Sequence, residues 1–346
     1  MESLNIALVL VVIAVAAYDF TNGFHDAADM VATAIASRAM RPGTAIAIVS
    51  IFTLIAPFSV GLAVADTVGT FIDISDLSHQ MGEAIVIAAL LAAISYNLIT
   101  WKLGYPSSSS NSLAGGLTGA GLYAAGTSHI NWGWDALQQF QLTGLMKVGA
   151  GLLVSPLFGF VIGYLIMKFF FLVFRRFNVK IRPLFIITQY FSVAWLGFSH
   201  GANDAQKGMA IIGMMLLASG HTSTFSVPDW AILLCATSIT LGTMFGGWSI
   251  IKTLGFGLYR LRTLHAVANQ LGSALVNSLA TAIGAPTSTT QVVTATLLGN
   301  GAAEKPQHVR WKKAAGIVTG WWLNIPVSML LGAVYCAVYL ALWSPP

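Results

Sequence analysis

The chain has 346 residues, of which 56% are hydrophobic and only 8% are charged. Soluble domains usually carry about 25% charged residues, so this composition excludes an ordinary water-soluble protein. The formal net charge of +5 does not indicate nucleic-acid binding, because the basic residues lie in short loops between apolar runs. The long apolar runs predict an all-α polytopic membrane protein, since a helix satisfies its own backbone groups in lipid.

Ten apolar runs follow one another along the chain, and we expect helices in all of them. They cover residues 4–37, 44–64, 83–103, 107–126, 144–174, 184–219, 229–250, 264–284, 287–300 and 314–343. The first and the sixth exceed the roughly 20 residues that one span needs. Polar residues interrupt both near the middle, in the stretches "YDFTNGFHD" and "FSHGAND". We therefore predict two discontinuous helices, each broken at membrane depth.

Two short motifs occur twice, in the same order and at nearly equal separation. Gly-x-x-Asp-Ala stands at 23–27 and again at 201–205, and "PSSSSN" at 106–111 matches "PTSTTQ" at 286–291. The first glycine precedes the proline by 83 residues in the first half and by 85 in the second. The agreement of the two separations indicates an internal repeat.

Each half holds five apolar runs, an odd number, so the second half enters the membrane from the opposite face. Two inverted-topology repeats are typical of secondary transporters. We divide the chain into a first repeat core at 1–143, a linking helix with a basic cytoplasmic loop at 144–183, and a second, inverted repeat at 184–346. Each repeat is expected to contain one broken helix and one helical hairpin tipped by Ser/Thr residues.

The distribution of basic residues predicts the topology. Loops without lysine or arginine lie at 65–82, 126–143 and 220–228. Loops that contain them lie at 38–42, 175–183, 251–262 and 305–313. The positive-inside rule places the second group in the cytoplasm. We therefore expect a multi-pass protein of the inner (cytoplasmic) membrane with both termini outside.

Asp26 and Asp204 occupy equivalent positions at the two predicted breaks. Ionisable groups at membrane depth are costly and are functional candidates by default. The alternative is that each aspartate only caps the half-helix that follows it. Asp29 and Lys207 are also equivalent but opposite in charge. They form an ion pair across the repeats, or else Asp29 binds a cation while Lys207 faces an anion or the cytoplasm.

Runs of hydroxyl side chains follow Pro106 and Pro286. They comprise Ser107, Ser108, Ser109 and Ser110 in the first half, and Thr287, Ser288, Thr289 and Thr290 in the second. We place each proline in the first turn of a helix, where its missing N–H is tolerated. Free N–H groups, hydroxyls and the positive helix end would together bind a tetrahedral oxyanion. Helix packing by small residues is the alternative, and full spans or re-entrant hairpins remain open.

Aspartates beside an oxyanion site repel the anion unless a proton or a cation lies between them. Hydrogen phosphate carries its own proton at neutral pH and sulfate does not, so the pattern favours phosphate and cation-coupled movement. His25 and His200 precede the aspartates and are candidates for proton relay, because imidazole titrates near neutrality. The alternative for both is a packed histidine bonded to the backbone.

The stretches "NGFHDAADMVAT", "FSHGANDAQKG", "PSSSSN" and "PTSTTQ" resemble the paired signatures of the PiT inorganic phosphate transporters, most closely the bacterial low-affinity type. The resemblance covers nearly the whole chain. It implies a secondary active transporter that imports phosphate by symport with H⁺ or Na⁺, with a neutral divalent metal–phosphate complex as a further form of the substrate. The chain departs from many relatives at Asp29, Asn111, Gln270 and Gln291.

The resemblance and the motifs together give the candidate residues. For phosphate they are Asp26, Ser107, Ser108, Ser109, Ser110, Asn203, Asp204, Thr287, Ser288, Thr289 and Thr290. For the coupling cation they are Asn22, Asp26, Asp29, Asn111, Asp204, Gln270 and Gln291. Asp26 and Asp204 would be the ligands if Na⁺ or a metal–phosphate complex is carried.

Two other functions fit parts of the pattern. A permease for sulfate or a related oxyanion would use the same architecture. An intramembrane serine hydrolase would need one serine held by one base, and duplicated runs of four hydroxyls do not fit it. The expected partners are inorganic phosphate, the coupling cation and membrane lipid, with a homodimer left open. No cofactor, no catalytic residue and no nucleic acid are expected.

Overall fold

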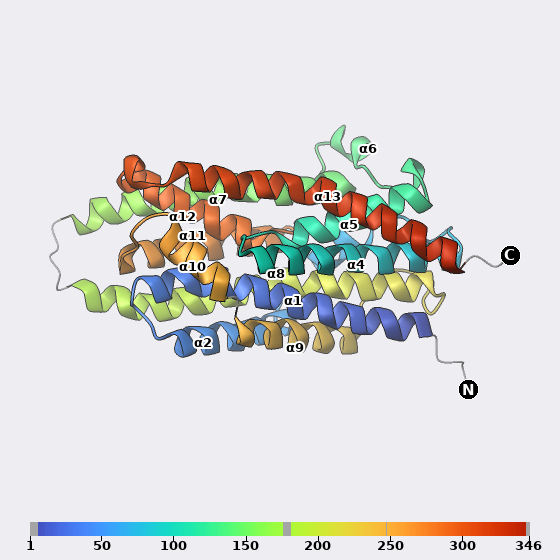
Figure 1. Ribbon diagram of the computed structural model, residues 1–346, viewed down its shortest axis with the longest axis horizontal. Helices are drawn as coiled ribbons and strands as arrows, with labels where there is room; N and C mark the ends of the chain where they lie inside the picture. The colour runs from blue at the N-terminus through green and yellow to red at the C-terminus, as the bar shows by residue number, and fades with distance from the viewer. Residues whose placement is uncertain (1–5, 176–180, 247, 344–346) are drawn as a thin grey trace.

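The computed structural model describes residues 6–175, 181–246 and 248–343, and these are mainly helical. The helices are α1 (Ile6–Ala36), α2 (Pro42–Ile55), α3 (Ala63–Gly69), α4 (His79–Leu103), α5 (Ser109–Ala124), α6 (Trp134–Leu137), α7 (Gly144–Phe174), α8 (Arg182–Ala218), α9 (Asp229–Phe245), α10 (Trp248–Gly257), α11 (Thr263–Ala282), α12 (Thr289–Glu304) and α13 (Trp311–Trp343). Most lie along one long axis, and both termini are at the same end (Figure 1). The predicted all-α fold is confirmed.

Within the described residues, four helices are long and apolar enough to cross a membrane, namely α1, α4, α7 and α13. Helices α2 and α3 are separated by a short break with a bend of 76°, and together they would form a fifth span if they count as one. Helix α8 has 37 residues, enough to cross a bilayer, but polar side chains lower its hydropathy. The chain is therefore a multi-pass membrane protein.

The prediction of discontinuous helices at the two aspartate motifs is wrong. Helix α1 continues for 31 residues through Asp26, and α8 continues for 37 residues through Asp204. Neither helix has a proline in its interior or a residue with positive φ, since Pro183 lies in the first turn of α8, where proline is tolerated. Polar side chains interrupt the apolar pattern, but they find partners on neighbouring helices, so the backbone need not unwind. The alternative that these aspartates cap half-helices is wrong for the same reason.

The chain does break before both hydroxyl runs. Helix α4 ends in Gly104 at φ +68°, and Gly284, which follows α11, has φ +67°. Such left-handed positions suit glycine, and they let the chain turn sharply. The next helices begin at Ser109 and Thr289, so the prolines precede the first turn rather than lying within it, which corrects that prediction.

Ser108 and Ser288 are the N-caps of these two helices, with almost identical backbone angles. The Ser108 hydroxyl accepts a hydrogen bond from the Asn111 amide at 3.0 Å, and the Ser288 hydroxyl accepts one from the Gln291 amide at 3.3 Å. The two tips therefore have the same local structure. In each, one hydroxyl caps the helix, and the amide groups of the first turn stay free of intrahelical bonds.

The two hairpins, α4–α5 and α11–α12, approach each other from opposite ends of the molecule (Figure 1). Helices α5 and α12 have 16 residues each. At 1.5 Å per residue they are about 24 Å long, less than the roughly 30 Å of a hydrocarbon core. The tips meet where the Ser110 hydroxyl donates to the Thr287 carbonyl at 2.8 Å. The short second helices and the meeting of the tips favour re-entrant hairpins, whereas α4, with 25 residues, is itself long enough for a span, so both alternatives stay open.

Packing between the halves is reciprocal. Helix α9 packs on α1 as α2 packs on α8, and α13 packs on α5 as α7 packs on α12. The equivalent glycines Gly23 and Gly201 make the close contacts, against the backbone of Ile239 and Thr53. Helices α1 and α8 run in opposite directions along the long axis (Figure 1). These relations are the ones that an inverted repeat predicts. The division of the chain into parts that end at residues 143 and 183 stays a prediction.

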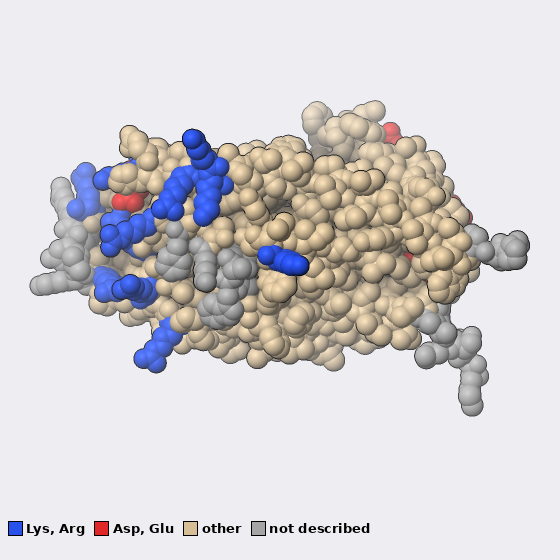
Figure 2. Space-filling view, viewed as in Figure 1, with Lys and Arg blue, Asp and Glu red and all other residues tan. Residues whose placement is uncertain are grey.

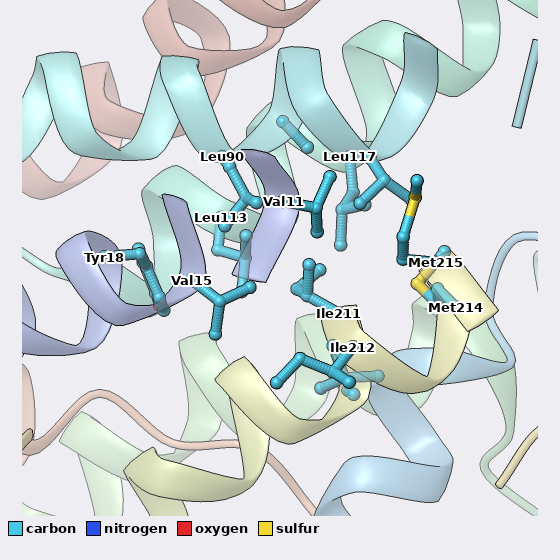
Figure 3. Close-up of a cluster of buried hydrophobic side chains, with 14 of the residues drawn as sticks. Val11, Val15, Tyr18, Leu90, Leu113, Leu117, Ile211, Ile212, Met214 and Met215 are labelled. Carbon is cyan, nitrogen blue, oxygen red and sulfur yellow. The ribbon is translucent and has the colours of Figure 1, made fainter. Parts of the chain in front are cut away.

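Two apolar clusters flank the middle of the molecule. In the first, Val15, Leu90, Leu113 and Ile211 meet from α1, α4, α5 and α8 (Figure 3). The second joins residues that include Val31 of α1, Val193 of α8 and Val293 of α12. On both α1 and α8 the polar residues lie between these clusters. The described conformation therefore closes the middle of the molecule on both sides.

Basic side chains gather at the end of the molecule opposite the termini (Figures 1 and 2). The loops at 38–42, 258–262 and 305–310 all reach this end, as do the last turn of α7 and the first turn of α8. The predicted grouping of the basic loops is thus present in the described residues. Residues 176–180, which belong to one of these loops, lie outside the described part. The cytoplasmic orientation of this end stays a prediction.

Candidate functional site

A polar face runs along the middle of α1. Asp19, Asn22, Asp26 and Asp29 follow one another at intervals of three and four residues, which places them on one side of a helix. All four are buried, with at most 2% of their surface exposed. Buried charged groups need partners, because the cost of removing them from water is high. The partners come from α8 and from the two hairpin tips.

Both motif aspartates contact the tip of the second hairpin. The Thr290 hydroxyl lies 2.9 Å from Asp26 Oδ1 and 2.5 Å from Asp29 Oδ2. The Thr289 hydroxyl donates to Asp204 Oδ2 at 2.8 Å. Sequence positions more than 80 residues apart thus converge on two neighbouring threonines. The structure brings together the carboxylates and the hydroxyls that sequence reasoning paired.

Lys207 is buried to 1% exposure and lies between the two tips. Its ammonium group pairs with Asp204 and donates to the Ser110 hydroxyl at 2.5 Å and to the Thr287 carbonyl at 2.7 Å. Among the described residues it makes no ion pair with Asp29, so the predicted pair across the repeats is wrong. It does not face the cytoplasm either, because both hairpin tips and α8 enclose it.

The tip of the first hairpin is held by amide side chains. The Ser109 hydroxyl donates to Asn22 Oδ1 at 2.5 Å. Asn324 on α13 donates to the Ser107 hydroxyl at 3.1 Å and to the Ser108 carbonyl at 2.7 Å. Neither motif aspartate accepts a hydrogen bond from a described residue of this first tip. The two halves therefore share a local fold but differ in their contacts with the carboxylates.

Asn203, a predicted phosphate ligand, is engaged in holding the second hairpin. Its amide group donates to the Thr281 hydroxyl at 2.9 Å and to the Ala285 carbonyl at 3.1 Å. Its carbonyl oxygen accepts a hydrogen bond from the Thr287 amide at 3.0 Å. The Thr287 hydroxyl in turn donates to Asn277 at 3.3 Å. In this conformation Asn203 positions the tip and has no polar atom left over for an anion.

The residues predicted for a coupling cation fall into two groups. Asn22, Asn111 and Gln291 lie at the tips with Asp26, Asp29 and Asp204. The side-chain oxygens of Asn111 and Gln291 are buried and have no hydrogen-bond partner among the described residues. Gln270 lies apart: it accepts a hydrogen bond from Ser192 at 2.8 Å and donates to the Met30 carbonyl at 3.2 Å. Gln189 donates to the same Gln270 oxygen.

Two sets of buried side chains have the donor chemistry and spacing of a cation site. One is His25, Asp26 and Asp29; the other is Asp26, His200 and Asp204, and in each set the ligand atoms lie within 4.8 Å of one another. Asp26 belongs to both. Carboxylate oxygens suit hard cations, and the imidazole nitrogens suit a transition metal. The residues present therefore fit either Na⁺ or a divalent metal ion.

Both motif histidines are buried beside these carboxylates. His200 Nδ1 lies 2.7 Å from Asp204 Oδ2 and 3.9 Å from Asp26 Oδ2, so it lies between the two aspartates. His25 Nδ1 lies 3.4 Å from Asp26 Oδ1. Each histidine therefore contacts a carboxylate. The alternative given above, a packed imidazole bonded to the backbone, does not describe these contacts. A role in proton relay stays a prediction.

Sequence reasoning missed Asp19. It is fully buried, and neither of its oxygens accepts a hydrogen bond of ordinary geometry from a described residue. The thiol of Cys235, a weak donor, faces it from α9. Gly208 of α8 allows this approach, because a Cβ atom there would collide with the Asp19 carboxylate. The spacing of Asp19, Asn22, Asp26 and Asp29 along one helix face was the signal that could have found it.

Asn97 and Asn277 were missed as well. Each stands nine residues before the proline of its own hairpin. Asn97 accepts a hydrogen bond from the Ser112 hydroxyl at 3.1 Å, and Asn277 donates to Thr289 at 3.3 Å. Their equal distance from the prolines extends the repeat. They brace the tips from α4 and α11.

Comparisons with known proteins agree with this geometry. A model of the phosphate transporter family matches residues 22–332. Over 336 residues the chain is 36% identical to a probable low-affinity inorganic phosphate transporter of Bacillus subtilis, covering 96% of this chain and 97% of the relative. A protein of the same description from Rhizobium meliloti is 38% identical over 336 residues, which is 96% of each chain.

Among solved structures, the sodium-dependent phosphate transporter has the same fold, with a TM-score of 0.84 and 23% identity over 97% of this chain and 99% of that one. The curated relatives are named as transporters rather than enzymes, which rules against the serine hydrolase interpretation. The resemblance indicated by the motifs is confirmed, and the chain belongs to the phosphate transporter family.

Proposed function

We propose that this protein is a secondary active transporter that imports inorganic phosphate across the inner membrane by symport with H⁺ or Na⁺. The observation that carries the proposal is the meeting of two hydroxyl-tipped helix N-termini beside a cluster of buried carboxyl groups. The names of the relatives and of the structural neighbour support phosphate as the substrate and a cation as the coupling ion.

The tips supply the donors for the anion. The amide groups of Ser109, Ser110, Thr289 and Thr290 are in the first turns of α5 and α12, where helices lack internal partners. Their hydroxyls lie beside these amides and can rotate toward an anion placed between the tips. Lys207 adds one positive charge at the same place. Together these groups would hold a tetrahedral oxyanion, as helix N-termini do elsewhere.

The charge balance explains the coupling. Four buried carboxyl groups, Asp19, Asp26, Asp29 and Asp204, face one buried lysine in the described part of the chain. Thr290 has a single hydroxyl hydrogen for its two contacts with Asp26 and Asp29. A proton or a metal ion between these carboxylates would remove the repulsion, and it would also let an anion approach. The anion and the cation therefore enter together.

The same geometry accommodates a divalent metal–phosphate complex. Asp26 and Asp204, with the histidines beside them, would hold the metal ion while the tips hold the phosphate. In the described conformation the two apolar clusters close the site on both sides. Transport would require each cluster to open in turn, and the reciprocal packing of the two halves suits such alternation.

The proposal is tested by uptake of radiolabelled phosphate into proteoliposomes that contain the purified protein. Gradients of H⁺ and Na⁺ are imposed separately, with and without Mg²⁺, and sulfate is added as a competitor. We expect one of the gradients to drive accumulation above equilibrium and excess sulfate to leave it nearly unchanged. Phosphate that only equilibrates under both gradients would refute symport, and strong inhibition by sulfate would favour the sulfate permease.

A further inference from the structure

A pocket opens at the basic end of the molecule, and none of its lining residues belongs to the hairpin tips. Its volume is about 850 Å³. The ends of α1, α7, α8, α10 and α11 form its walls together with the segment before α13. Phe170, Phe185 and Leu261 are among the residues that line it, and because their side chains are largely buried they form an apolar part of its lining. We call it the arginine pocket because of the residues at its mouth.

Among the described residues, six exposed arginines line the arginine pocket and form its mouth. They are Arg38, Arg175, Arg182, Arg260, Arg262 and Arg310. Arg262 pairs with Glu304, and Arg310 donates to the Gly257 carbonyl at 3.3 Å. The other four form no ion pair with any described residue. The mouth therefore presents an excess of guanidinium groups that are free to bind an anion.

The backbone at Arg38 is a second, independent sign of function. Arg38 has φ +55°, in the left-handed region that favours glycine. It follows α1 in a capping turn, in which Arg38 N donates to the Ile35 carbonyl and Ala39 N donates to the Ala34 carbonyl. Glycine is the usual residue at this position of the turn. An arginine held there against its backbone preference indicates that its side chain has a role at the mouth.

The need for positive charge on the cytoplasmic side explains the number of basic residues but not their convergence on one pocket. Guanidinium groups bind phosphate through paired hydrogen bonds. A fully hydrophilic anion would make no use of the apolar part of the pocket lining. Beside the pocket, α7 and α8 expose Leu172 and Ile187 on the outer surface. The pocket thus suits an anion that carries both a phosphate group and an apolar part.

We propose that the arginine pocket binds a phosphate-bearing anion, with the arginines holding the phosphate and the phenylalanines holding an apolar portion. Phospholipids of the surrounding membrane have this chemistry, and soluble polyphosphates share its charged part. The pocket shares no residue with the hairpin-tip site. Binding at this pocket is therefore independent of the proposed transport function and can be measured without transport.

The test is native mass spectrometry of the purified full chain with added phosphatidylglycerol, phosphatidylcholine or tripolyphosphate. The variants are Arg38→Gln and Arg182→Gln, and the matched control is Arg41→Gln, an exposed arginine outside the pocket. We expect the wild type to retain phosphatidylglycerol over phosphatidylcholine. Each pocket variant should bind it roughly tenfold more weakly, which is the loss of one charge-assisted hydrogen bond, and the control should not change.

If the pocket variants weaken the binding of tripolyphosphate but not that of phosphatidylglycerol, the ligand is a soluble anion. A further variant, Arg38→Gly, separates folding from binding, because glycine relieves the backbone while removing the side chain. It should unfold at the same or a higher temperature than the wild type and still bind weakly. Equal binding by the wild type and both pocket variants, or an equal loss in Arg41→Gln, would overturn the proposal.

Discussion

A hydrogen bond of 2.9 Å from the Thr290 hydroxyl to Asp26 Oδ1 joins the tip of the second hairpin to the middle of α1. Its counterpart in the second half, Thr289 to Asp204, also uses the second tip. Ser109 and Ser110 of the first tip bind Asn22 and the Thr287 carbonyl instead. The site is therefore asymmetric, although the backbone of the two tips is almost the same.

The aspartates are the first target for mutation. Asp26→Asn and Asp204→Asn should each lower coupled phosphate uptake at least about tenfold, since each removes a buried charge that a cation must balance. Both variants should remain folded and inserted, because asparagine keeps the shape and still accepts hydrogen bonds. The measurement is the initial rate of uptake per inserted protein. Asp76→Asn, at an exposed position, is the control, and near wild-type uptake by either site variant would leave that aspartate a purely structural role.

The hydroxyl groups at the tips should affect affinity. Thr289→Val and Thr290→Val keep the side-chain shape but remove one donor each, and should raise the apparent KM for phosphate roughly five- to tenfold. Ser109→Ala and Ser110→Ala should raise it as well. The backbone amides remain in all four variants, so binding should weaken without disappearing.

The asymmetry adds a difference between the tips. The threonine variants should also change the dependence of uptake on the driving cation, because both threonines contact carboxylates, whereas the serine variants should not. The experiment compares cation titrations of the four variants at saturating phosphate. Identical cation dependence in all four would contradict the asymmetry.

Labelling of single cysteines tests the topology. Cysteines placed at Ser128, between α5 and α6, and at Ser223, between α8 and α9, are in exposed positions of loops without basic residues and should react with an impermeant reagent outside intact cells. A cysteine at Gln307, at the basic end, should react only after the cells are opened. The native Cys235 and Cys336 are buried and provide an internal negative control. Labelling of Gln307→Cys in intact cells would reverse the orientation.

The stability of the fold should depend on pH through contacts at the base of the second hairpin, where α11 begins and α12 ends. Glu304, at the end of α12 outside the membrane-spanning segments, contacts His265 at 2.6 Å and also pairs with Arg262. The hydrogen bond from His265 is the main cause that lowers the pKa of Glu304 from 4.5 to about 2. A lowered pKa stabilises the fold above the ordinary value, and this stability is lost as the pH falls toward 2.

Thermal unfolding in detergent measures this effect. The wild type should lose stability between pH 4.5 and about 2, and Glu304→Gln should lose less over the same interval while being less stable at pH 7. Parallel pH profiles of the two proteins would show that the contact contributes nothing to stability.

The sequence predicted the parts of the site that repeat. The two Gly-x-x-Asp-Ala motifs and the two proline–hydroxyl runs occur at matched spacing, and these matched pairs lie together at the centre of the structure. The hairpins and the grouping of basic loops also follow from local patterns. These features depend on residues close together in the chain, such as the Gly104 turn and the Ser108 cap.

The errors came from contacts between distant segments. Polar residues in α1 and α8 suggested broken helices, because a polarity pattern does not reveal whether a neighbouring helix supplies partners. Lys207 is the exception: its ion-pair partner, Asp204, stands three residues before it on α8, and the equivalent positions of Lys207 and Asp29 in the two repeats pointed to the wrong carboxylate. Asp19 went unnoticed because it lies outside the repeated motif, and only Gly208 on another helix reveals how closely it is packed.

The most direct test of the central claim is a structure of the full chain determined with phosphate bound. We predict one tetrahedral density between the two tips, with oxygens about 3 Å from the hydroxyls or amides of Ser109, Ser110, Thr289 and Thr290. A cation should lie beside Asp26. If the coupling ion is H⁺, an Asp26 oxygen should instead lie within hydrogen-bond distance of a neighbouring acceptor oxygen, which requires the carboxyl group to be protonated. Phosphate bound elsewhere in the protein, or tips that remain in mutual contact with no anion between them, would contradict the account.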